Sequence, residues 1–306
     1  MNGHALVIGE ALVDMVRRPS GEESAHPGGS PANVAIGLGR LDRDVELLAW
    51  IGLDEHGTLI RDHLEESTVA LARGSESALR TSVAVANLDA NGVAQYDFDL
   101  SWAVSPQASP RPGPLVVHTG SIGAVLAPGA ATVIDMVRAL RPTSTITYDP
   151  NARPALMGDP RTARQSIERV VALADVVKVS DEDLAWLAPD TAPEDVARGW
   201  LMHEGPAMVI VTRGGEGASA YLHDGRTVTV TAPRVEVADT VGAGDSFMGG
   251  LIDGLWSADV LGGDKREALR SIDSAVLQQI LERSAHIAAI TVSRSGANPP
   301  RTAELE

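Results

Sequence analysis

The sequence predicts an α/β protein in which a mostly parallel β-sheet carries helices on both faces. Short apolar runs alternate with longer segments of helical periodicity along most of the 306 residues, and this rhythm is typical of β-α-β units. The hydrophobic fraction of 44% and the charged fraction of 22% are ordinary for a globular protein, and a chain of this length buries a sizeable core. Sheets of this kind bind ligands at the carboxyl ends of their strands, so the site is expected there.

The individual elements follow from the spacing of apolar residues. Short apolar runs predict strands of the main sheet at residues 5–8, 45–51, 115–119, 145–148, 176–179 and 208–212. Segments with helical spacing predict helices at residues 33–41, 59–66, 130–140, 161–173, 193–203 and 246–256. Pro31 stands near the first turn of the first helix, where proline is favoured.

Two segments break the alternation. Residues 81–100 alternate with period two around the turn signal Asp89-Ala-Asn-Gly92, which predicts a hairpin. Residues 12–25 follow the first strand and are partly extended and polar. Together they are expected to form a small β-rich flap over the open end of the sheet. The alternative is two surface hairpins with no special role.

Composition excludes several classes of function. The net charge of −16 argues against binding to nucleic acid or to an anionic membrane, because both need a basic surface. The absence of cysteine excludes disulfides, thiolate metal sites and cysteine nucleophiles. The first residues lack the basic region and the long apolar run of a signal peptide, and no segment approaches 18 apolar residues. A cytoplasmic protein is therefore expected.

The run DTVGAGDSFMGG at residues 239–250 carries the strongest chemical signal. A glycine-rich turn before a helix frees backbone N–H groups, which together with the helix dipole bind anions such as phosphate. The carboxylate of Asp245 repels anions, so it is interpreted as a proton acceptor beside the phosphate. An anion cradle with an adjacent base indicates a phosphotransferase.

Three further clusters follow expected strands or precede a helix. In PGGSPAN at residues 27–33, two consecutive glycines let a ligand approach the backbone closely, and the amide of Asn33 suits a sugar hydroxyl. A simple turn at the start of a helix explains this cluster equally well. DPNAR at residues 149–153 is expected at the ligand edge of the sheet, or as a bare turn. TRGGEG at residues 212–217 is expected beneath a nucleotide, though such loops are common. Zinc spacings, a G-x-S-x-G elbow, a Walker loop and a Rossmann fingerprint are all missing.

Taken together and in this order, the clusters resemble the PfkB (ribokinase-like) carbohydrate kinases. GEALVD at residues 9–14 looks like the first strand of that family, PGGSPANVAIGLGRL at 27–41 like its N-terminal signature, and GLDEHG at 52–57 like the motif that follows. VEVADTVGAGDSFMGGL at 235–251 contains the C-terminal signature, which begins at Val237. The resemblance implies a ribokinase-like three-layer sandwich formed by one kinase domain, residues 1–306. Its β lid is expected at about residues 12–26 and 79–102, and it implies a homodimer formed through the lid.

The resemblance also implies roles for individual residues. Asp245 matches the catalytic base, and the anion hole is matched by Gly242, Ala243 and Gly244. Sugar contacts are expected at Asp14, Gly28, Gly29, Asn33 and Arg153. ATP contacts are expected at Lys178, Thr212, Gly214 and Gly217.

Metal ions are implied in the same way. Mg²⁺ is expected to bridge the phosphates mostly through water and nucleotide oxygens, with Asp183 standing in for the glutamate of the family's N-x-x-E and Ser180 for its asparagine. Many members bind a monovalent cation near Asp239 and residues 293–300, so K⁺ is a further expected cofactor. Pro300 replaces a hydroxyl residue that is common there, which argues against activation by potassium.

The pattern D-P-N-A-R with K-V-S-D-E-D at residues 178–183 looks most like bacterial fructokinases and 2-keto-3-deoxygluconate kinases. Phosphorylation of fructose to fructose 6-phosphate is the expected activity, with ketodeoxygluconate kinase or ribokinase-type activity as alternatives. An aromatic content of 3% argues against a nucleoside kinase. An alternative of another class is a sugar-binding sensor without turnover, which the intact Asp245 argues against.

Overall fold

The computed structural model describes residues 3–88, 94–202 and 205–305. Its centre is a nine-stranded sheet with the order β13-β12-β11-β10-β9-β8-β1-β4-β5. The run from β11 to β5 is parallel throughout, and only β12 and β13 pair antiparallel at one edge. The predicted mostly parallel sheet is confirmed.

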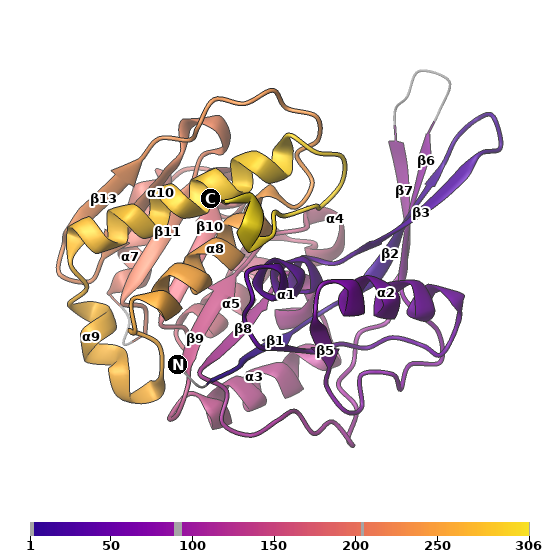
Figure 1. The fold of residues 1–306 in the computed structure, drawn as a ribbon, viewed down its shortest axis with the longest axis horizontal. Helices are drawn as coiled ribbons and strands as arrows, with labels where there is room; N and C mark the ends of the chain where they lie inside the picture. Colours follow the sequence, from indigo (N-terminus) through magenta and orange to yellow (C-terminus); the bar gives the residue numbers. More distant parts are fainter. Residues whose placement is uncertain (1–2, 89–93, 203–204, 306) are drawn as a thin grey trace.

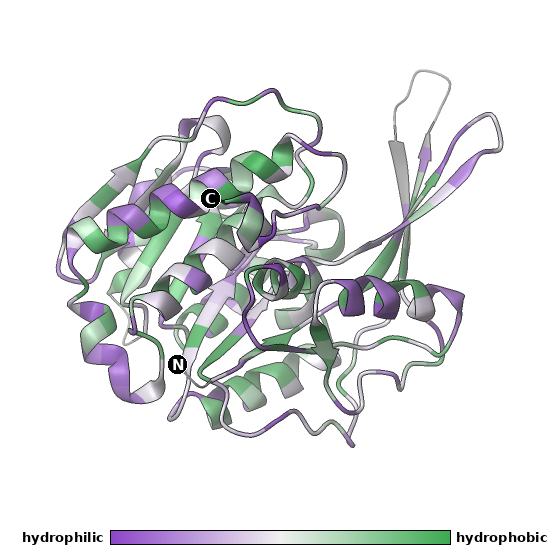
Figure 2. Ribbon diagram, viewed as in Figure 1, coloured by the Kyte–Doolittle hydropathy of each residue, from purple (hydrophilic) through white to green (hydrophobic). Residues whose placement is uncertain are grey.

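The strands are short and buried, as their apolar runs require. The sheet consists of β1 (Ala5–Ile8), β4 (Val45–Leu48), β5 (Val69–Leu71), β8 (Val116–Gly120), β9 (Thr145–Asp149), β10 (Val176–Ser180), β11 (Met208–Thr212), β12 (Ala218–Leu222) and β13 (Thr227–Val230). In β1, β4, β8, β10, β11 and β12, alternate residues belong to two separate hydrophobic clusters, one on each face of the sheet. Figure 2 shows the resulting hydrophobic strands at the centre of the molecule, with hydrophilic residues on outer helices such as α9.

Helices cover both faces, which completes the three layers (Figure 1). One hydrophobic cluster joins the sheet to α1 (Ser30–Arg40), α2 (Glu55–Glu66), α8 (Ala243–Ser257), α9 (Arg266–Arg270) and α10 (Ser274–Val292). The other joins it to α3 (Gly129–Leu140), α5 (Pro160–Val171), α6 (Asp181–Leu187) and α7 (Pro193–Leu201). A single turn, α4 (Pro154–Met157), follows β9. Within the described residues, no helix is long and apolar enough to cross a membrane.

A second sheet forms the predicted flap. It consists of β2 (Leu12–Arg17), β3 (Glu23–Gly28), β6 (Val83–Leu88) and β7 (Ala94–Asp99), in the order β3-β2-β6-β7. Figure 1 shows that its far end extends away from the three-layer body. We call this sheet the lid. The turn predicted at residues 89–92 lies outside the described residues.

Several elements differ from the sequence prediction. Helix α8 begins at Ala243, three residues earlier than expected, because Gly242 adopts the left-handed backbone that starts it. Strands β5, β12 and β13 and the helices α4, α6, α9 and α10 were not predicted. Helix α10 carried a usable signal, since the side chain of Asp273 caps its first turn and Leu277, Ile280 and Leu281 follow at helical spacing.

Candidate active site

A cavity of about 310 Å³ lies where the lid meets the carboxyl ends of the strands. Its walls come from β2 and β7 of the lid, the start of α1, the loop after β9 and the first turn of α8. These segments are far apart in the sequence, and the parallel sheet places their ends at one edge. A cavity of this size at this edge fits a small polar ligand.

The carboxylate of Asp245 is buried at the floor of the cavity, with 6% of the residue exposed. Its Oδ1 accepts a hydrogen bond from the Ser30 hydroxyl at 2.7 Å, and its Oδ2 accepts one from the Asn33 amide at 2.8 Å. A longer contact of 3.5 Å comes from the Asn151 amide. Burial raises the pKa of Asp245, the bonds from Ser30 and Asn33 oppose the rise, and the charge of Asp149 adds to it.

The first turn of α8 has the backbone that the predicted anion cradle requires. Gly242 has φ 77°, and within the described chain no side chain caps the helix. The N–H of Ala243 makes only a long bond of 3.3 Å to the Thr240 carbonyl. Gly242, Ala243, Gly244 and Asp245 all line the cavity. Backbone N–H groups at this helix start are therefore oriented to bind an anion beside the Asp245 carboxylate.

We expect Gly242→Ala to lower kcat/KM at least about tenfold, because it disturbs backbone donors of the cradle. The added Cβ is strained at this positive φ and lies 2.6 Å from the Cβ of Ala297. Gly225→Ala is the matched control, because Gly225 has φ 89° but open space around it. Steady-state assays of both variants measure the effect. Equal activity of the two variants would contradict the proposed cradle.

A buried charge cluster lies beneath this turn. Lys178 Nζ donates to Asp149 Oδ2 at 2.7 Å, and the two side chains are 4% and 0% exposed. A Cβ on Gly244 would lie only 2.7 Å from Lys178 Nζ, so the ammonium group lies against the cradle. Burial alone would lower the pKa of Lys178, but Asp149, with help from Asp245 and Asp183, raises it. Lys178 therefore presents a fixed positive charge to the cradle.

Asp183 belongs to the same cluster. It lies in the first turn of α6, where its N–H donates to the Ser180 hydroxyl at 3.0 Å and its Oδ1 accepts the N–H of Ala152 at 3.1 Å. Burial and the charge of Asp149 raise its pKa, against the opposing effect of Lys178. Among the described residues, no group of three or more acidic or histidine side chains could hold a metal ion. A magnesium ion fits this chemistry if nucleotide oxygens and water supply most of its ligands.

The structure brings most of the predicted sugar contacts together. Asp14, Gly29, Asn33 and Arg153 all line the cavity. Gly29 has φ 107°, and a Cβ there would lie 2.5 Å from the Glu10 carbonyl, so only glycine fits. The cavity lining does not include Gly28; a Cβ there would lie 2.2 Å from Asp14 Oδ2, so Gly28 leaves room for that carboxylate.

Arg153 is exposed, and its guanidinium donates to the carbonyls of Asn151 and Ala152 and to the side chain of Asn151. In the described part of the chain, it forms no ion pair with a carboxylate. Burial raises the pKa of the Asp14 carboxyl, and the charge of Arg153 opposes that rise. The cavity thus holds a cation that is free to meet an anionic or polar group of a ligand.

The residues predicted to contact ATP follow β11 at the same edge of the sheet. Thr212 ends that strand, and Gly214 begins a 3₁₀ turn with φ 46°. Gly217 has φ 108°, and a Cβ there would lie 2.1 Å from the Val230 carbonyl, so its conformation serves the packing of β13. None of the three lines the 310 Å³ cavity. Their contact with a nucleotide stays a prediction.

The place predicted for a monovalent cation fits it poorly. The two carboxylate oxygens of Asp239 accept the N–H groups of Val241 and Gly296, at 3.0 and 2.9 Å. Pro300 offers no hydroxyl, and the Pro299 carbonyl accepts a hydrogen bond from Arg40 at 2.7 Å. These oxygens already have donors, so no step of the reaction is assigned to K⁺.

Sequence reasoning missed several side chains that line the cavity or, like Asp149, belong to the charge cluster beside it. Ser30, Asn151 and Asp149 stood within motifs that were noticed, but no role was assigned to them. Glu10 also stood within a motif, residues 9–14, without a role, and Ser121 gave no usable signal, because the importance of both comes from burial in the fold. Burial raises the pKa of Glu10 to about 7, against hydrogen bonds from Ser121 and Gly123 and the charge of Arg153. The ionised form of Glu10 is therefore disfavoured in the folded state. The contribution of Glu10 to stability is present at low pH, where the carboxyl is neutral, and is lost as the pH rises through about 7.

Comparison with known proteins agrees with this geometry. The pattern of the pfkB family carbohydrate kinases matches residues 3–304. Fructokinase from Klebsiella pneumoniae is 33% identical over 263 residues, which cover 83% of this chain and 85% of that protein. A fructokinase double mutant from Vibrio cholerae O395, solved with fructose, ADP and potassium ion, has a TM-score of 0.78 at 25% identity and covers 99% of this chain and 97% of its own. Aminoimidazole riboside kinase from Salmonella enterica has a TM-score of 0.79 at 25% identity, and the match covers 99% of this chain and 98% of that protein.

Proposed function

The chain belongs to the pfkB family of carbohydrate kinases, and from that premise we propose that it transfers the γ-phosphoryl group of ATP to the 6-hydroxyl of fructose. The products are fructose 6-phosphate and ADP. One observation carries the proposal: the buried Asp245 carboxylate lies between the cradle of α8 and the cavity beneath the lid. A sugar hydroxyl and a phosphate can therefore meet at the same carboxylate.

Each side of the site has a separate task. The N–H groups of residues 242–244 and the charge of Lys178 stabilise negative charge on the transferring phosphoryl group. Asp14, Asn33 and Arg153 orient the sugar so that its hydroxyl faces Asp245. A bound Mg²⁺ would neutralise phosphate charge, with Asp183 nearby to hold its water ligands.

The proton balance is simple. As the sugar oxygen forms its bond to the γ-phosphorus, the bond from that phosphorus to the β-phosphate oxygen breaks and ADP leaves. The hydroxyl proton passes to Asp245 and from there to solvent after the lid opens. A carboxylate is a sufficient acceptor, because the hydroxyl loses its proton late in a loose transition state.

The fructokinase relatives support fructose as the acceptor. Arg153, which forms no ion pair within the described residues, favours a second candidate, because a guanidinium suits the carboxylate of a sugar acid such as 2-keto-3-deoxygluconate. Both candidates present a primary hydroxyl to the same base.

A substrate panel separates these candidates. We expect fructose to give the highest kcat/KM in an ADP-release assay that also contains ribose, ketodeoxygluconate and nucleosides. Arg153→Gln is the informative variant, since loss of the cation should weaken a sugar acid far more than a neutral sugar, by roughly 10-fold or more. If ketodeoxygluconate is preferred and this preference disappears in Arg153→Gln, the second candidate replaces the first.

A further inference from the structure

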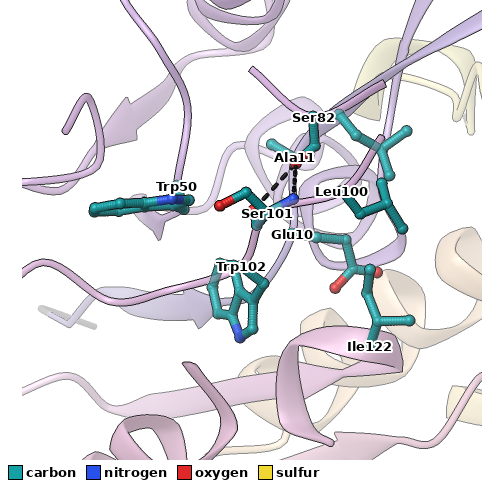
Figure 3. Close-up of a pocket in the computed structure, with 9 residues that line it drawn as sticks. Glu10, Ala11, Trp50, Ser82, Leu100, Ser101, Trp102 and Ile122 are labelled. Carbon is teal, nitrogen blue, oxygen red and sulfur yellow. Dashed lines mark hydrogen bonds between the residues drawn. The ribbon is translucent and has the colours of Figure 1, made fainter. Parts of the chain in front are cut away.

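The segments that connect the lid to the body converge on one place. Residues 9–11 lead from β1 to β2, Gly29 leads from β3 to α1, Ser82 precedes β6, and residues 100–102 follow β7. Ser82 and Ser101 are tied by two hydrogen bonds of 3.0 Å, drawn as dashed lines in Figure 3. The N–H of Val13 donates to the Ser82 carbonyl at 3.0 Å. This place, which we call the lid hinge, encloses a cavity of about 10 Å³, enough for roughly one water molecule.

Two buried side chains of the lid hinge bond to the same residue of the body, Gly123. Glu10, 6% exposed, accepts the N–H of Gly123 on its Oε2 at 3.0 Å. The indole of Trp102, 3% exposed, donates its Nε1–H to the carbonyl of Gly123 at 2.9 Å. One contact comes from the segment entering the lid and the other from the segment leaving it. In Figure 3 the side chains of Glu10 and Trp102 both lie below Ser82 and Ser101, and Glu10 lies next to Ile122.

Gly123 tolerates this attachment only because it has no side chain. A Cβ there would lie 2.8 Å from the Gly9 Cα and 3.1 Å from Glu10 Oε2. The neighbouring Ser121 has φ 49° and also bonds to the Glu10 carboxylate. Glu10, Ser121 and Ile122 all line the 310 Å³ cavity. The lid hinge and the sugar cavity therefore share a wall.

We propose that Glu10 is a positioning residue: with Trp102 it holds the two polar backbone groups of Gly123 and so sets the lid over the bound sugar. This inference rests on the proposed function. A lid held in register captures sugar and excludes water from the phosphoryl group. A loosened hinge should therefore weaken sugar binding and let water compete with the sugar hydroxyl.

The test uses Glu10→Gln and Trp102→Phe in the full chain. Glu10→Gln keeps the size of the side chain and weakens its bond to Gly123, whereas Trp102→Phe keeps an aromatic ring, is smaller, and removes the other bond to Gly123. We expect each to raise the KM for sugar roughly 3- to 10-fold, with a smaller change in kcat, and to increase ATP hydrolysis relative to sugar phosphorylation. In the double variant the KM for sugar should rise by less than the product of the two single increases, because both bonds hold the same residue, Gly123.

Glu46→Gln is the matched control. Glu46 is 5% exposed and its Oε2 also accepts a backbone N–H, that of Arg111 at 2.8 Å, but it lies outside the sugar cavity. Hydrogen exchange of the β2 and β6 amides, which needs no substrate, should quicken in Glu10→Gln and Trp102→Phe but not in Glu46→Gln. Unchanged exchange, or effects of Glu10→Gln on KM and hydrolysis equal to those of Glu46→Gln, would overturn the inference. A wild-type protein that phosphorylates no sugar would instead contradict the proposed function, and the exchange result would still decide the role of Glu10.

Discussion

Asp245→Asn is expected to lower kcat at least about 100-fold with little change in the KM for sugar, because it removes a positioned base and keeps the shape of the site. Asparagine is isosteric, and the hydroxyl of Ser30 can reverse its hydrogen bond to meet the new amide. Steady-state kinetics of ADP release measure the change. Asp253→Asn, which alters another buried carboxylate of α8 away from the cavity, is the control and should keep kcat near that of the wild type.

The same variant, Asp245→Asn, is expected to be more stable than the wild type although it is less active. The pKa of Asp245 is raised in the folded protein, so its stability contribution is present at low pH and is lost as the pH rises through the folded-state value. At neutral pH the ionised carboxylate therefore costs stability, and Asp245→Asn should raise the free energy of unfolding. Urea titrations at neutral pH test this. A variant that is both inactive and less stable would indicate a structural defect rather than the loss of a base.

Lys178→Met is expected to lower the free energy of unfolding by about 3–5 kcal/mol, because it leaves the buried Asp149 carboxylate without its partner. Lys178 holds a raised pKa, so its contribution is fully present at neutral pH and is lost only as the pH rises through that value. The substitution also removes the positive charge beside Gly244, so activity should fall as well. Urea titration and kinetics at one pH measure both effects.

The chain provides its own control for this prediction. Lys265, the only other lysine, is 31% exposed and pairs with Asp259, so Lys265→Met should cost less than about 1 kcal/mol. Adding Asp149→Asn to Lys178→Met should recover part of the lost stability, since the carboxylate that paired with Lys178 is then replaced by a neutral amide. Equal losses from the two lysine variants would mean that the buried pair does not stabilise the fold as described.

The fold was predictable where each local pattern had one interpretation. The apolar run of β11 could only be a buried strand, and the structure reproduces its limits, Met208–Thr212. Strand β12 was missed because its alanines and serine differ little in hydropathy. Strand β13 carried a usable signal that was overlooked, since Thr227–Val230 alternates threonine with valine. Strand β5 has three residues, too few for a periodic signal. The lid was predicted because apolar and polar residues alternate with period two over residues 81–100, which interrupts the succession of strands and helices.

The site was predictable to the level of motifs and no further. Glycines before a helix imply an anion cradle from sequence alone, and Gly242 confirms the required backbone. The bonds from Ser30 and Asn33 to Asp245 depend on how α1 packs against α8, which no local pattern encodes. Glu10 was overlooked for the same reason: only the convergence of the lid segments buries it beside Gly123.

The most direct test of the proposed function is the stoichiometry of one reaction. With wild-type protein, ATP, Mg²⁺ and fructose, we expect ADP and fructose 6-phosphate to appear mole for mole, and we expect both products to form at least about 100-fold more slowly with Asp245→Asn. Binding of fructose without release of ADP, for fructose and for every other sugar tried, would contradict the kinase mechanism and leave a sugar sensor as the better description.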